Sequence, residues 1–98
     1  LITATRHHAE PENADEALMM DIDLLIFAAD RRRYDVHAGD IRREHPHIDG
    51  PGFDLQRAEF LHTFLRRKSI YWTRHFRKLN EVQARANLER ELAMLQRT

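Results

Sequence analysis

Apolar side chains recur at intervals of three or four along most of this 98-residue chain, as they do on one face of an α-helix. The clearest segment follows Asn80, which is predicted to cap the last helix. Its stripe consists of Val82, Arg85, Leu88, Leu92 and Leu95. Three earlier helices are predicted over residues 13–29, 34–44 and 54–67, and residues 1–8 resemble the end of another.

Polar and turn-forming residues mark the ends of these helices. Asn13 with Glu16 three residues later is typical of a capping box, and Asp54 is a predicted N-cap. Residues 45–52 hold prolines and glycines and are predicted to form a loop. The inner face of the third helix should carry Leu55, Ala58, Leu61, Phe64 and Leu65. The pattern predicts an all-α chain, a single helical domain of four or five helices over residues 1–98.

Residues 19–29 form an apolar run that contains two carboxylates, Asp21 and Asp23. Because this helix is apolar nearly all round, we expect it to be central and buried. A buried carboxylate is costly unless a cation, a metal ion or strong hydrogen-bond donors compensate it. Residues two apart on a helix lie about 200° apart around its axis. The two acids therefore cannot face the same pocket, and at most one of them is the working residue.

The composition fits a small helical domain, with 42% apolar and 33% charged residues. The chain has no cysteine, which excludes disulfides and thiolate metal sites and agrees with a reducing cytoplasm. No apolar segment reaches the roughly 18 residues of a membrane span, so no membrane partner is expected. Because the chain opens at Leu1, without a methionine and inside an apolar segment, we expect it to be the C-terminal half of a longer domain.

The formal net charge is zero, but the charges are unevenly distributed. Seven acids and no Lys or Arg occur over residues 10–30, whereas residues 61–79 contain six bases and no acid. The bases are Arg66, Arg67, Lys68, Arg74, Arg77 and Lys78. Two interpretations stay open: two faces that are solvated or pair with each other, or a basic surface for a phosphate-bearing partner.

Candidate catalytic groups are few. None of the seven histidines has the His-x3-His spacing of two metal ligands on one helical face, and only His7 and His8 suggest a pair that can face Asp21 or Asp23. The single serine and the lack of a glycine-rich loop exclude the usual nucleophile and phosphate-loop motifs. Polar residues beside apolar anchors are either buried structural groups or phosphate ligands. These residues are Arg42, Glu44, Arg85 and Asn87.

Several blocks of residues occur in a characteristic order. They are Ile2-x-x-Thr5-x-x-His8, Asp21-Ile22-Asp23-Leu24-x-Ile26, Ile41-Arg42-x-Glu44, Ile70-Tyr71-x-Thr73-x-x-Phe76 and Glu81-x-x-Ala84-Arg85-x-Asn87-Leu88-x-x-Glu91-Leu92. The ordered set resembles the bacterial predicted metal-dependent phosphohydrolases of the HD superfamily, and it runs through essentially the whole chain.

The resemblance implies an HD-domain-like helical bundle in which a divalent metal ion is held by a histidine, a His-Asp doublet and a later aspartate. That aspartate falls in the Asp21–Asp23 block. The resemblance favours Asp23, because the aspartate of the superfamily usually precedes a hydrophobic helical stretch, as Asp23 precedes Leu24, and Asp21 is the alternative. His8 matches a histidine that assists a phosphate or the metal, and Arg42 or Arg85 would support the pocket. The expected substrate is a phosphate-containing small molecule or nucleotide rather than nucleic acid.

The chain also departs from the family pattern. It contains no His-Asp dipeptide, and Ile22 stands where the family often has alanine between the two acids. We therefore expect the remaining ligands to lie upstream and this chain to be inactive alone. The alternative hypothesis is a non-catalytic helical module that self-associates, or that binds an anionic partner through the six bases of residues 61–79.

Overall fold

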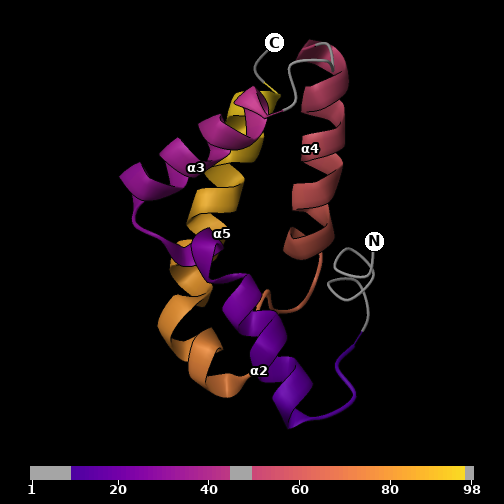
Figure 1. Ribbon diagram of the computed structural model, residues 1–98, viewed down its shortest axis with the longest axis vertical. Coiled ribbons are helices and arrows are strands. Elements are labelled where there is room, and N and C mark those ends of the chain that lie inside the picture. Colours follow the sequence, from indigo (N-terminus) through magenta and orange to yellow (C-terminus); the bar gives the residue numbers. More distant parts are fainter. Residues whose placement is uncertain (1–9, 45–49, 97–98) are drawn as a thin grey trace.

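The computed structural model describes residues 10–44 and 50–96, which form helices joined by short turns (Figure 1). In chain order these are α2 (Ala14–Asp23), the short 3-10 helix η1 (Leu25–Ala28), α3 (Arg31–Arg43), α4 (Gly50–Leu65) and α5 (Arg74–Leu95). The described residues include no strand, so the predicted all-α class is confirmed. The predicted helix end over residues 1–8 and most of the predicted loop over 45–52 lie outside the described residues.

The long helix α5 is the element against which the others pack. It contacts η1, α3 and α4, and in Figure 1 α3 and α4 lie along its C-terminal half while α2 lies near its start. The core consists of Leu24, Phe27, Tyr34, Leu61, Phe64, Ile70, Tyr71, Ala84 and Leu88. None of the described helices has the length and apolar character needed to cross a bilayer.

The predicted helix over residues 13–29 is divided in two. Asn13 caps its start as predicted, accepting a hydrogen bond from the Glu16 amide at 2.8 Å. However, α2 ends at Asp23, and η1 then turns Phe27 into the core. At the break, the Leu24 carbonyl accepts a hydrogen bond from the Phe27 amide at 3.1 Å and another from the distant Tyr71 hydroxyl at 2.8 Å. Long-range hydrogen bonds therefore end a helix that local propensity would continue.

The expected all-round burial of this helix is wrong. Only Ala17, Met20 and Asp21 are buried in α2. The apolar side chains on its other side, Leu18, Met19 and Ile22, are about half-exposed. An exposed apolar surface of this kind is characteristic of a contact face.

Two other helices begin earlier than predicted. Asp30 accepts a hydrogen bond from the Arg33 amide at 2.9 Å, so the arginine run forms the first turn of α3 instead of preceding the helix. Helix α4 begins at Gly50, which places Asp54 inside the helix and not at its N-cap. Leu55, predicted on the inner face, is exposed, and Phe53 and Arg57 are buried instead.

The last helix also starts sooner, at Arg74, with Thr73 as its N-cap. The Thr73 hydroxyl oxygen accepts a hydrogen bond from the Phe76 amide at 3.3 Å. Asn80, the predicted cap, therefore lies within the helix. Val82, predicted on the inner stripe, is exposed, and the buried face of α5 carries Ala84, Asn87, Leu88 and Glu91.

Candidate functional site

Asp21 is fully buried and accepts three hydrogen bonds from the segment that leads into α5. Its carboxylate oxygens lie 2.7 Å from the Trp72 amide, the Thr73 amide and the Thr73 hydroxyl. These donors lie at the start of α5, where the helix dipole also favours a negative charge. The cost of burying Asp21 is thus offset by donors of the protein itself, and its burial needs no metal ion to explain it.

Asp23 lies on the other side of the same helix. It is the last residue of α2 and is exposed, and its neighbour Ile22 is half-exposed. Because Asp21 holds the end of α2 against α5, the backbone that carries Asp23 is fixed in position. The two acids therefore have different surroundings, since Asp21 is enclosed in the core and Asp23 is exposed to solvent.

The described residues do not by themselves form a divalent-metal site. Within residues 10–44 and 50–96, no three His, Asp or Glu side chains are grouped closely enough to hold an ion. His7 and His8, which the sequence pairs with the Asp21–Asp23 block, lie outside the described residues.

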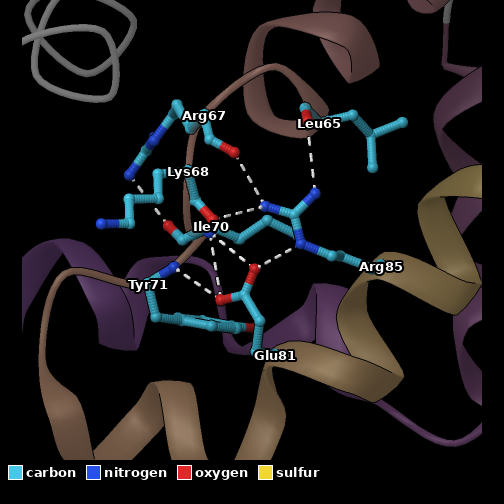
Figure 2. Close-up of polar contacts among 7 residues, drawn as sticks. All are labelled: Leu65, Arg67, Lys68, Ile70, Tyr71, Glu81 and Arg85. Atoms are coloured by element: carbon cyan, nitrogen blue, oxygen red, sulfur yellow. Dashed lines mark hydrogen bonds and ion pairs between the residues drawn. The ribbon is translucent and has the colours of Figure 1, made fainter.

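Arg85 clamps the connector between α4 and α5 (Figure 2). Its guanidinium donates to the Leu65 carbonyl at 3.2 Å, to the Arg67 carbonyl at 2.8 Å and to Glu81 at 2.7 Å. Most of its donors are thereby used inside the protein, so a phosphate would have to displace these bonds to reach it.

Glu81, which pairs with Arg85, also binds the connector between α4 and α5. Its carboxylate accepts hydrogen bonds from the Ile70 amide, at 2.8 Å to one oxygen, and from the Tyr71 amide at 3.3 Å (Figure 2). The i,i+4 ion pair of Glu81 with Arg85, at 2.7 Å, belongs to a network that orders a non-helical segment. This segment carries Trp72 and Thr73, the residues that bind Asp21.

Arg42, the other predicted support residue, lies on the surface between α3 and α4. It forms an ion pair with Asp54 at 2.6 Å, and its guanidinium carbon lies 5.0 Å from the centre of the Phe53 ring. With these residues it lines a half-open pocket of about 320 Å³ that also includes Asp35, Glu91 and Met94. The pocket is lined by three carboxylates and one exposed guanidinium, so it has no net positive charge and does not favour a phosphate.

A buried ion pair that sequence reasoning did not identify joins three helices. Glu91 of α5 accepts from the Arg57 guanidinium at 2.7 and 3.1 Å and from the Tyr34 hydroxyl. Burial, and secondarily the Glu91 carboxylate, raises the pKa of Tyr34 well above its ordinary value. The signal in the sequence was positional, since Glu91 follows Ala84, Asn87 and Leu88 at helical spacing on one face.

The Asn87 side chain forms hydrogen bonds with backbone carbonyls at the end of η1. Its amide nitrogen donates to the Phe27 carbonyl at 2.8 Å and to the Ala29 carbonyl at 2.7 Å, while its oxygen accepts from Gln83 at 3.1 Å. Of the two interpretations that the sequence left open for this polar residue, a buried structural group is the one that its contacts support.

The basic segment of residues 61–79 is partly used inside the protein. Arg67 lies over the Trp72 ring at 4.5 Å and donates to the Ile70 carbonyl at 2.8 Å, and Arg77 donates to the Trp72 carbonyl at 2.6 Å. Burial lowers the pKa of Arg67, while Asp21 and Glu81 oppose that shift. The exposed bases of the segment are Arg66, Lys68, Arg74, Arg77 and Lys78.

No protein-family model, curated protein or solved structure shows a significant match to this chain.

Proposed function

We propose that this chain supplies the Asp23 side of the metal site of an HD-type, metal-dependent phosphohydrolase that acts on a phosphate ester or a nucleotide. The observation that carries the proposal is the contrast between two acids of one helix. Asp21 is held by three donors and fixes the end of α2, whereas Asp23 is exposed beside it. A ligand on a fixed element meets the geometric demands of a metal site better than one on a loop.

The surface around Asp23 supports the same proposal. Leu18, Met19 and Ile22 are half-exposed on α2, and apolar patches of this kind usually face another part of the assembly. A segment that covers them would also exclude water from Asp23. Exclusion of water strengthens the interaction of a carboxylate with a cation.

The remaining ligands have to come from outside the described residues. The chain has no His-Asp dipeptide, and one carboxylate holds a divalent ion weakly, so the 98 residues alone should be inactive. His8 is the residue of this chain proposed to assist. The bound ion would polarise a phosphate oxygen and make a water nucleophilic.

The test uses the longest polypeptide that the gene encodes around this sequence. Purified protein is loaded with Mn²⁺ or Ni²⁺, and hydrolysis of p-nitrophenyl phosphate and of nucleotides is measured. Asp23→Asn should lower kcat/KM at least about 100-fold, as expected for a metal ligand, with an unchanged melting temperature.

Asp15→Asn is the matched control, because Asp15 is an exposed acid on the same helix. It should leave both metal content and activity unchanged. Equal turnover in Asp23→Asn and wild-type protein would remove Asp23 from the site, and no metal-dependent turnover on any substrate would exclude the proposed function.

A second candidate is the non-catalytic module that binds an anionic partner. The observation that favours it is the exposure of Arg66, Lys68, Arg74 and Lys78 in a stretch without any acid. Binding to heparin or another polyanion should then weaken steeply with salt. An absence of binding at low ionic strength rules this candidate out.

A further inference from the structure

The outer face of α5 carries a stripe of exposed residues that the proposed function does not use. These are His75, Leu79, Val82, Ala86, Glu89 and Ala93, and each is exposed to solvent. Their spacing alternates between four and three residues, which is the a/d pattern of helices that pair in a coiled coil.

The most exposed side chains of this stripe are apolar. Val82 is 85% exposed and Leu79 is 64% exposed, whereas the opposite face of α5 already contains the buried residues Ala84, Leu88 and Glu91. The outer stripe therefore cannot be covered by the described core of its own chain. Ala86 is one turn after Val82, and its small side chain lets a second helix approach closely.

The charges along this face indicate which partner fits. The exposed base Lys78 lies at the edge of this face near the start of α5, and the exposed acid Glu89 lies on the face toward the end of the helix. Two copies of α5 in parallel would bring the two Lys78 side chains to the same level. In antiparallel order, Lys78 of each copy lies beside Glu89 of the other, so the helix is complementary to itself.

We propose that two copies of this chain associate through α5 in antiparallel order. Val82 of one copy packs against Ala86 of the second, and a two-fold axis passes between these residues. Such an interface is isologous and closes at a dimer. The α2 surface around Asp23 takes no part in it, so the dimer is independent of the proposed function.

Sedimentation equilibrium of the full chain tests the interface. The wild-type protein should change from monomer to dimer as its concentration rises. Val82→Glu should weaken dimerisation about 100-fold, because each dimer loses two buried valines and gains two buried charges. The matched control is Val36→Glu on α3, which is also an exposed valine on a helix and should dimerise like wild type.

Charge reversal and cross-linking test the orientation. Lys78→Glu should weaken the dimer, and adding Glu89→Lys in the same chain should restore it. Because the chain has no cysteine, single variants can be mixed without background disulfides. Val82→Cys mixed with Ala86→Cys should give mainly disulfides between the two variants.

Two results would overturn the proposal. One is a monomer at all concentrations, or a dimer that Val82→Glu leaves intact, with circular dichroism showing that the variant is folded. The other is a preference for disulfides between identical variants, which would mean a parallel arrangement.

Discussion

Helices α2 and α5 both bury polar residues and expose apolar ones, but their buried groups have different partners. In α2, Asp21 is satisfied by one short segment, residues 72 and 73. In α5, Asn87 binds the turn after η1, and Glu91 binds both α3 and α4. Asp21 thus joins α2 to the segment just before α5, while the buried polar residues of α5 connect most of the described elements.

The comparison shows why the two helices should respond differently to substitution. A buried polar group is stabilising only when all its partners are in place, so each such group also selects one arrangement of the elements around it. Glu91 compensates a buried cation, whereas Asp21 accepts hydrogen bonds mainly from neutral donors. Removing Glu91 should therefore cost more than removing Asp21, and measured free energies of unfolding can test that order.

The largest effect is expected for Glu91→Ala. It leaves the Arg57 guanidinium, which is 8% exposed, without its carboxylate and frees the Tyr34 hydroxyl. Loss of one partner of a buried ion pair costs about 3–5 kcal/mol. Urea unfolding followed by circular dichroism measures the loss. Glu59→Ala, which removes an exposed acid of α4, should change the free energy by less than about 0.5 kcal/mol.

Asp21→Ala should be the next most destabilising change, at about 2–3 kcal/mol, because two amides and a hydroxyl lose their acceptor. Asp23→Ala on the exposed side should cost less, at most about 1 kcal/mol, because interactions of exposed carboxylates are weak. Similar losses in the two variants would contradict the division of roles between these acids, which is also the basis of the proposed function.

How far the sequence predicts the fold depends on the range of the interaction involved. The all-α class and the Asn13 cap follow from local patterns, and both are confirmed. At the break after Asp23, the Leu24 carbonyl accepts a hydrogen bond from Tyr71, a residue far away in the sequence. Periodicity cannot reveal such a bond, so the sequence predicts one continuous helix where the structure has two.

The contacts of the candidate site are likewise predictable only where they are local in the sequence. The sequence identifies Asp21 and Asp23 as unusual and places them on different faces, because helical geometry is local. It cannot say that the Asp21 charge is compensated by amides of residues 72 and 73, since they become neighbours only in the fold. Nor does it pair Arg57 with Glu91, although Glu91 stands conspicuously among apolar residues of one face. The metal-ligand role of Asp23 stays a prediction.

A smaller effect on the free energy of unfolding is expected at alkaline pH. Burial raises the pKa of both Tyr34 and Tyr71 above the ordinary value of 10.0, and these are the only tyrosines in the chain. Above pH 10 the unfolded chain loses these protons and the folded chain keeps them. Stability is therefore lost as pH rises, by about 1 kcal/mol per tyrosine between pH 10 and 11. Tyr34→Phe should roughly halve that slope, and an unchanged slope would disprove the assignment.

The smallest predicted effect concerns where α5 begins, which links the two helices. Thr73 caps α5 and also donates to Asp21, so Thr73→Ala should cost about 1 kcal/mol. Asn80 lies inside the helix, and Asn80→Ala should be neutral or stabilising by up to about 0.5 kcal/mol, since alanine is the better helix former. The melting temperatures of the two variants test this order of stability. The reverse order would mean that the helix starts after Asn80, as its local pattern predicts, and that Asp21 does not hold its first turn.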